Sequence, residues 1–87
     1  MAAQDYKITI NLRGSFANAQ MLPQLMLKYE SDIDLSVDSY VVDAKSLFGV
    51  LSLTSGRDLT ITVHEKVEGE AKDIYRALSE IGILVED

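Results

Sequence analysis

The sequence predicts a small α+β domain in which helices pack on one face of a β-sheet. In several short segments, apolar residues alternate with polar ones, as they do in half-buried strands. In others, apolar residues recur every three or four positions, as they do on one face of a helix. The 87 residues, of which 47% are hydrophobic, supply one core and therefore one domain spanning residues 1–87.

The first half of the chain begins with a strand, in which Tyr6, Ile8, Ile10 and Leu12 alternate with polar residues. After the break at residues 13–15, residues 19–29 carry apolar side chains at helical spacing. Pro23 lacks an N–H and fits best in a first helical turn. We therefore expect this helix to begin near Gln20 or Met21, or else to be kinked.

From residue 33 onward, the residue patterns predict five more elements, three strands and two helices. Alternation over residues 33–37 and 40–42 indicates two strands joined by a turn at Asp38-Ser39. Ser46 is a good N-cap for a short helix, which we expect to end at Thr54-Ser55-Gly56. Residues 59–64 alternate most cleanly and predict the last strand. A helix follows, with a stripe formed by Ala71, Ile74, Tyr75, Leu78 and Ile81.

Composition narrows the classes of function. The chain has no cysteine, so disulfides, thiolate metal sites and cysteine nucleophiles are excluded. A formal charge of −6 argues against binding to nucleic acid or to an anionic membrane surface. Asp32 and Asp34 share a strand face but have no further ligands beside them, so we expect no metal site. No signal peptide or spanning segment is evident, and we expect a cytoplasmic protein that has no cofactor and is not an enzyme.

Residues 42–53, Val-Asp-Ala-Lys-Ser-Leu-Phe-Gly-Val-Leu-Ser-Leu, resemble the second-helix region of the HPr family, the phosphocarriers of the phosphotransferase system. The similarity continues through Gly56, the strand at 59–63 and the acidic-glycine turn at 68–70. This resemblance implies an open-faced sandwich of order βαββαβα. Such a fold has a four-stranded antiparallel sheet with three helices on one face.

The HPr phosphoacceptor motif lies between the first strand and the first helix, where a histidine follows a glycine and precedes an arginine and a proline. Residues 13–20 here read Arg-Gly-Ser-Phe-Ala-Asn-Ala-Gln. Placing Gly14 on the family glycine puts Phe16 at the histidine and Asn18 at the arginine. A shift by one residue puts Ser15 or Ala17 there instead. The resemblance therefore implies a degenerate phosphoacceptor region, comprising Gly14, Ser15, Phe16 and Asn18, that cannot relay phosphate through histidine.

Two other residues could carry chemistry in principle. His64 is the only histidine, and in the HPr fold it would lie at the end of the sheet away from Gly14. We interpret it as a solvent-facing strand residue. Ser15 could be a hydroxyl nucleophile, but no base is evident beside it, and a loop serine before a helix is typically a cap or turn residue.

Ser46 carries a more specific implication of the resemblance. In Gram-positive HPr proteins the serine in this context is phosphorylated by a regulatory kinase, and the apolar residues after it dock partner proteins. Leu47 and Phe48 match those residues, and Leu51 and Met21 extend the expected partner-binding surface. The partners implied are HPr kinase and regulators of the phosphotransferase system or of transcription. Alternatively, Ser46 caps the helix and stays unmodified.

Three functions remain open from the sequence. The first, which we favour, is a non-enzymatic regulatory or adaptor protein. The second is a functional phosphocarrier that uses a non-standard site. The third is a diverged paralogue that uses the HPr scaffold to bind an unrelated partner. Pro23 and the apolar Phe16, Met21 and Leu22 replace the polar phosphate site with a more apolar surface, which suits protein contact.

Overall fold

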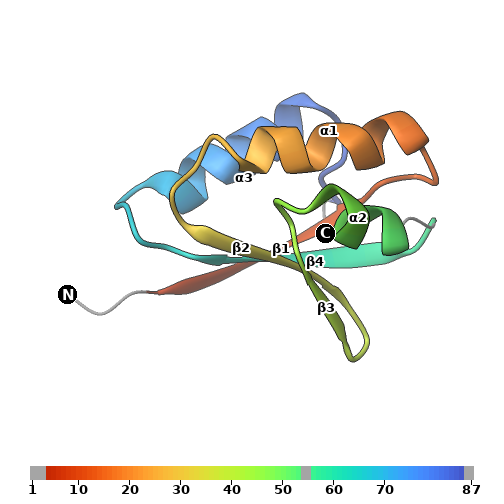
Figure 1. Ribbon diagram of the computed structural model, residues 1–87. Helices are drawn as coiled ribbons and strands as arrows, with labels where there is room; N and C mark the ends of the chain where they lie inside the picture. The colour runs from red at the N-terminus through yellow and green to blue at the C-terminus, as the bar shows by residue number, and fades with distance from the viewer. Residues whose placement is uncertain (1–3, 54–55, 86–87) are drawn as a thin grey trace.

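Within residues 4–53 and 56–85, which the computed structural model describes, four strands and three helices follow one another as βαββαβα. The strands are β1 (Asp5–Asn11), β2 (Asp32–Val37), β3 (Tyr40–Asp43) and β4 (Asp58–His64), and the helices are α1 (Phe16–Met26), α2 (Leu47–Ser52) and α3 (Glu70–Glu80). The strands form one antiparallel sheet in the order β1-β4-β2-β3. Figure 1 shows all three helices on the same face of this sheet, which confirms the predicted fold class.

The core lies between the sheet and the helices. Ile61 in β4 lies opposite Ile8 in β1 and Leu35 in β2, and all three side chains are buried. A slip of one residue in this register would turn the apolar side chains to solvent. The helices complete the core with the buried residues Ala19, Leu22, Met26, Val50, Ala71, Ile74 and Leu78.

Helix α1 begins earlier than the sequence predicted. The expected start near Gln20 or Met21 is wrong, because the helix runs from Phe16 and holds Pro23 in its interior. An interior proline costs roughly 3 kcal/mol through the lost hydrogen bond and ring crowding. Here Ser15 caps the helix, and the buried side chains of the core face, Pro23 included, offset that cost.

The turn between β2 and β3 and the end of α2 were also predicted from the sequence. The turn at Asp38-Ser39 is present, with Asp38 in the left-handed region at φ 53°. Helix α2 ends at Ser52, and the predicted stop at Thr54-Ser55-Gly56 falls largely outside the described residues. None of the described helices is both long and apolar enough to cross a membrane.

The outer edge of β1 is partly paired by the C-terminal segment, a contact that the sequence did not predict. The Asn11 N–H donates to the Ile83 carbonyl at 2.8 Å, and the Val85 N–H donates to the Thr9 carbonyl at 3.0 Å. This short antiparallel bridge covers the half of β1 that leads into α1. The half around Lys7 lies beyond it.

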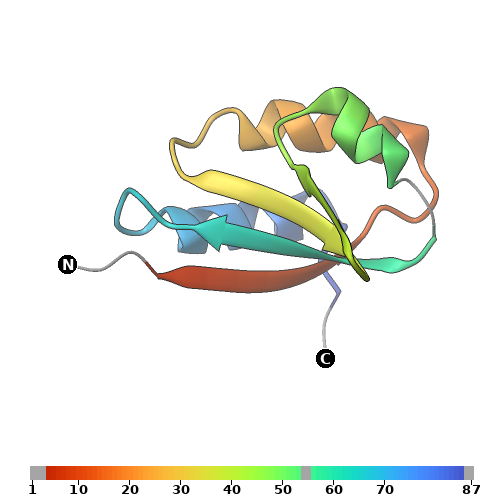
Figure 2. The same ribbon diagram turned by 60° about the horizontal axis from the view of Figure 1, so that its bottom comes forward.

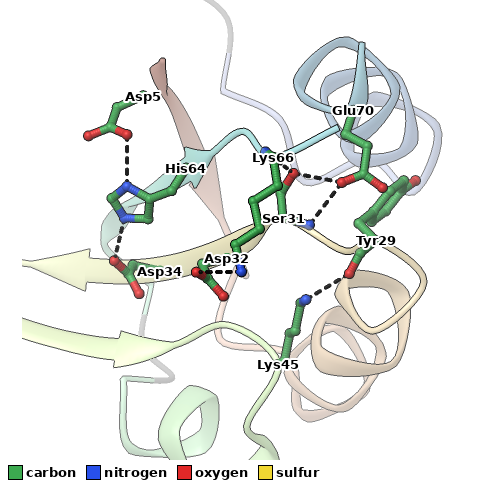
Figure 3. Close-up of polar contacts among 9 residues, drawn as sticks. All are labelled: Asp5, Tyr29, Ser31, Asp32, Asp34, Lys45, His64, Lys66 and Glu70. Atoms are coloured by element: carbon green, nitrogen blue, oxygen red, sulfur yellow. Dashed lines mark hydrogen bonds and ion pairs between the residues drawn. The ribbon is translucent and has the colours of Figure 1, made fainter. Parts of the chain in front are cut away.

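His64 links three strands on the open face of the sheet (Figure 3). Its Nδ1 lies 2.8 Å from Asp5 in β1, and its Nε2 lies 2.8 Å from Asp34 in β2. The hydrogen bonds to Asp34 and then to Asp5 raise the pKa of His64 above its ordinary value. The ring is partly exposed, as expected, but its two carboxylate partners were not predicted.

Glu70, at the start of α3, fastens the loop between α1 and β2 (Figure 3). Its carboxylate accepts hydrogen bonds from the hydroxyl and N–H of Ser31, at 2.6 and 2.9 Å, and from the Glu30 N–H at 3.1 Å. The Ser31 hydroxyl oxygen in turn accepts from the Lys66 N–H at 3.0 Å. Burial acts to raise the pKa of Glu70, but the hydrogen bonds from Ser31 and Glu30, together with the charge of Lys45, lower it overall.

Replacing the Glu70 carboxylate tests this fastening. In Glu70→Gln an amide NH2 faces some of these donors, and we expect a loss of about 1.5–3 kcal/mol in the free energy of unfolding at pH 7. Because the folded pKa is lowered, the contribution of Glu70 is present above the unfolded value of about 4.3 and is lost as the pH falls through the folded pKa. Urea unfolding at pH 7 and at pH 3 measures both effects.

The exposed Glu68→Gln is the matched control, with an expected change within about 0.5 kcal/mol. Equal stability of the Glu70 and Glu68 variants at pH 7 would contradict the role given to Glu70.

The raised pKa of His64 predicts that its contribution to stability changes with pH in the opposite direction to that of Glu70. Because its folded pKa is raised, its contribution to stability is complete below the unfolded value of about 6.5 and is lost as the pH rises through the folded pKa. We therefore expect the stability difference between the wild type and His64→Gln to shrink from pH 6 to pH 9, as measured by thermal unfolding at low salt. A difference that does not change with pH would show that the two aspartates do not favour the charged ring.

Candidate functional site

The loop between β1 and α1, which contains the predicted degenerate phosphoacceptor region, is held by local hydrogen bonds. The side-chain oxygen of Asn11 accepts from the Arg13 N–H at 2.7 Å. Arg13 and Gly14 both adopt left-handed backbone angles, at φ 58° and 64°, which turn the chain out of the sheet. The Asn18 side chain donates to the Leu12 carbonyl at 3.1 Å, so the loop is closed against the start of the helix.

Ser15 is the N-cap of α1, as the cap interpretation predicted. Its Oγ accepts from the Asn18 N–H at 3.2 Å. Among residues 4–53 and 56–85, no histidine, carboxylate or amine is hydrogen-bonded to this oxygen, so nothing there activates it as a nucleophile. Phe16 follows in the first turn with its side chain 61% exposed. The region therefore presents a capping hydroxyl, an engaged carboxamide and an exposed phenyl ring.

Ser46 occupies the same structural position on α2. Its Oγ accepts from the Gly49 N–H at 3.2 Å. Gly49 has little room for a side chain, because a Cβ there would lie 3.1 Å from the Val42 Cβ. The small residue thus lets α2 pack closely on β3, with the Ser46 side chain only partly buried.

The residues after Ser46 divide between surface and core. Phe48 is 83% exposed and Leu47 is 40% exposed, so both members of the adjacent pair reach the surface. Val50 is buried, and Leu51 packs partly against the core. Leu51 therefore adds less to an accessible surface than the other residues predicted for partner binding.

Helices α1 and α2 lie side by side (Figure 2). A small cavity of about 130 Å³ lies between them, lined by Gln20, Pro23, Gln24, Leu27, Lys45 and Leu47. We call the exposed apolar side chains of these two helices, Phe16, Leu27, Leu47 and Phe48, the α1–α2 surface. Met21, which was also predicted for partner binding, is 42% exposed on α1. Like Phe16 and Phe48, it does not line this cavity.

Sequence reasoning missed Leu27 as part of this surface. Leu27 is 63% exposed. The spacing of Phe16, Gln20, Pro23 and Leu27, by four, three and four residues, places them on one side of a helix. That signal becomes readable only when the helix is allowed to start at Phe16.

The charges around Ser46 are already engaged. The Lys45 ammonium donates to the Tyr29 carbonyl at 2.7 Å, and the Asp43 carboxylate accepts from the Lys45 N–H at 2.9 Å.

Within the described part of the chain, no three histidine, aspartate or glutamate side chains are grouped so as to hold a metal ion.

His64 lies far from the Ser15 cap. It is paired with Asp5 at the start of β1, whereas the Ser15 loop follows the end of that strand. A strand of 7 residues separates the two ends by roughly 20 Å. The imidazole therefore cannot serve the loop in which the HPr phosphoacceptor is expected.

Comparison with known proteins identifies the family. The family model described as PTS-HPr, "PTS HPr component phosphorylation site", matches residues 2–87. The crystal structure of HPr-C-His from Thermoanaerobacter tengcongensis is similar, with a TM-score of 0.69 and 24% identity over 86% of this chain and 92% of that one. The phosphocarrier protein HPr from Bacillus anthracis str. Ames has a TM-score of 0.66 and 25% identity over 92% of this chain and 96% of that one. The fold and the match across almost the whole sequence show that this chain belongs to the HPr family of the phosphotransferase system.

Proposed function

We propose that this chain is an HPr-family protein that does not relay phosphate through histidine and acts as a cytoplasmic regulatory or adaptor protein. One observation carries the proposal. The loop that should hold the phosphoacceptor contains the capping Ser15, while the only histidine is held between Asp5 and Asp34 at the far end of the sheet.

The chemistry of the loop supports this reading. Phosphoryl relay needs an acceptor that takes the group and releases it easily, as a histidine nitrogen does. A phosphoserine ester at Ser15 would hold the phosphoryl group too firmly to pass it on. The Asn18 side chain is already bonded to the Leu12 carbonyl, and it lacks the positive charge with which an arginine stabilises a phosphate.

The α1–α2 surface supports a binding role. Its four apolar side chains are 40–83% exposed. Exposed apolar residues that gather on one part of a small protein typically mark a site of protein contact. Partners that we expect there are proteins of the phosphotransferase system, HPr kinase or transcriptional regulators.

Ser46 is the residue we propose as the regulatory switch of this surface. A phosphate there adds a charge of about −1.5 to −2 directly before Leu47 and Phe48. The Gly49 N–H that now bonds to Ser46 Oγ can bond to a phosphate oxygen at the same helix end. The nearby Asp43 carboxylate opposes this, and Lys45 is engaged with Tyr29. The modification would therefore make an apolar surface anionic without a ready internal counter-charge.

A second function, a scaffold for an unrelated partner, is favoured by Phe16. Its 61% exposed ring stands in the first turn of α1, where an anion site would require polar groups. This alternative shares the surface of the first proposal and differs in needing no phosphate on Ser46.

Phosphorylation of Ser46 separates the two functions. After incubation with ATP and an HPr kinase, we expect intact mass to rise by about 80 Da, one phosphoryl group. The gain should vanish in Ser46→Ala. It should persist in Ser52→Ala, which alters a hydroxyl of the same helix that donates to the Gly49 carbonyl.

A wild-type protein that gains no mass, or a gain that persists in Ser46→Ala, would contradict the regulatory role of Ser46. The Ser46→Ala variant loses a helix cap at a cost of about 1 kcal/mol. Its thermal unfolding should therefore be recorded, so that a folded variant is known to have been assayed.

A further inference from the structure

A groove on the side of the molecule away from α2 lies between the edge strand β1 and the start of α3. It is a cavity of about 490 Å³, within the range of sites that hold ligands or side chains. Tyr6 and Ile8 of β1 line it from one side, and Ala71 and Tyr75 of α3 line it from the other. Tyr6 is 38% exposed and Tyr75 is 49% exposed, so two aromatic rings stand open at its mouth.

In the described part of the chain, the main chain of β1 beside this groove is available for pairing. Along a strand, the N–H and C=O of successive residues point alternately to the two sides. The Gln4 carbonyl accepts from the Glu65 N–H toward β4, whereas the Thr9 carbonyl and the Asn11 N–H bond outward to residues 83–85. Lys7 falls in the outward series, and no residue of 4–53 or 56–85 pairs with its outward N–H and C=O.

From these features we propose that β1 and the groove bind an extended peptide segment of a partner protein, which adds antiparallel to β1 around Lys7. The structure already uses this edge in the same way, because residues 83–85 pair antiparallel with residues 9–11. The peptide would continue that pairing along the same strand. Addition of a strand to an open sheet edge is a general mode of peptide recognition.

The alternation of the strand defines the chemistry of the peptide. The residue opposite Lys7 shares the open face of the sheet with it, because directly opposite residues point to the same side. Lys7 forms no ion pair with any described residue, so an acidic residue complements it. The two neighbours of that residue lie opposite Tyr6 and Ile8 and enter the groove, so they should be apolar. The expected segment is apolar, acidic, apolar.

A second copy of this chain fits the edge less well. Each copy carries a formal charge of −6, which makes two copies repel one another. Pairing around Lys7 would also place the two lysines opposite each other, and like charges in this position are destabilising.

The test uses the peptide acetyl-Ile-Glu-Phe-Thr-Thr-amide and the full chain labelled with nitrogen-15. We expect binding with a dissociation constant below about 1 mM, with amide shifts confined to residues 5–8 and 65–75, which include the groove lining. At about nine-tenths occupancy, hydrogen exchange of the Lys7 amide should slow roughly tenfold, because its N–H becomes bonded. This exchange signature separates strand addition from simple burial of an apolar side chain.

Matched variants test the two recognition features. Lys7→Glu should weaken this peptide at least about fivefold and strengthen acetyl-Ile-Lys-Phe-Thr-Thr-amide, whereas Lys28→Glu, outside the groove, should do neither. Tyr75→Ala should weaken binding at least about threefold, and Tyr40→Ala, on the opposite edge strand, should not.

Three results would each overturn the proposal. They are shifts centred on the α1–α2 surface, a Lys7 amide that is already protected in the free protein, and the absence of measurable binding while the amide spectrum shows a folded chain. The proposal does not rest on Ser46 or on the missing histidine, so its failure would leave the proposed function intact.

Discussion

Strand β4 is hydrogen-bonded on both sides, and its register against β1 and β2 determines which side chains face the helices and where His64 lies. With Ile61 between Ile8 and Leu35, the apolar side chains face the helices and the polar ones face solvent. The same register places His64 beside Asp5, at the end of the sheet remote from Ser15. The separation of the histidine from the phosphoacceptor loop is therefore a consequence of the packing of the core.

Local sequence patterns predicted the fold well, and long-range contacts account for what they missed. The strands were readable because alternation reports one-sided burial, and Ser15 and Ser46 were readable as caps because capping is local. The start of α1 was wrong because burial outweighed the local cost of Pro23. The bonds of Glu70 to Ser31 join residues 39 positions apart, and no local pattern reveals such a partner.

The two surfaces described here differ in how they would recognise a partner. The α1–α2 surface offers exposed side chains beside Ser46, the serine that we propose is phosphorylated, and this would suit a switchable contact with a folded protein. The β1 groove offers main-chain groups and a larger, mainly apolar cavity, which suits an extended segment. Helix α2 packs near β3, at the edge of the sheet opposite to β1. A partner on one surface would therefore not exclude a partner on the other.

The claim that this HPr-family chain does not relay phosphate is tested most directly by phosphorus NMR. The chain would be mixed with phosphoenolpyruvate and the first enzyme of the phosphotransferase system, with a histidine-bearing HPr in a parallel tube to show that the enzyme is active. The account predicts a phosphohistidine resonance from that HPr and none from this chain. A phosphohistidine resonance from this chain would assign the relay to His64, its only histidine, and would contradict the account.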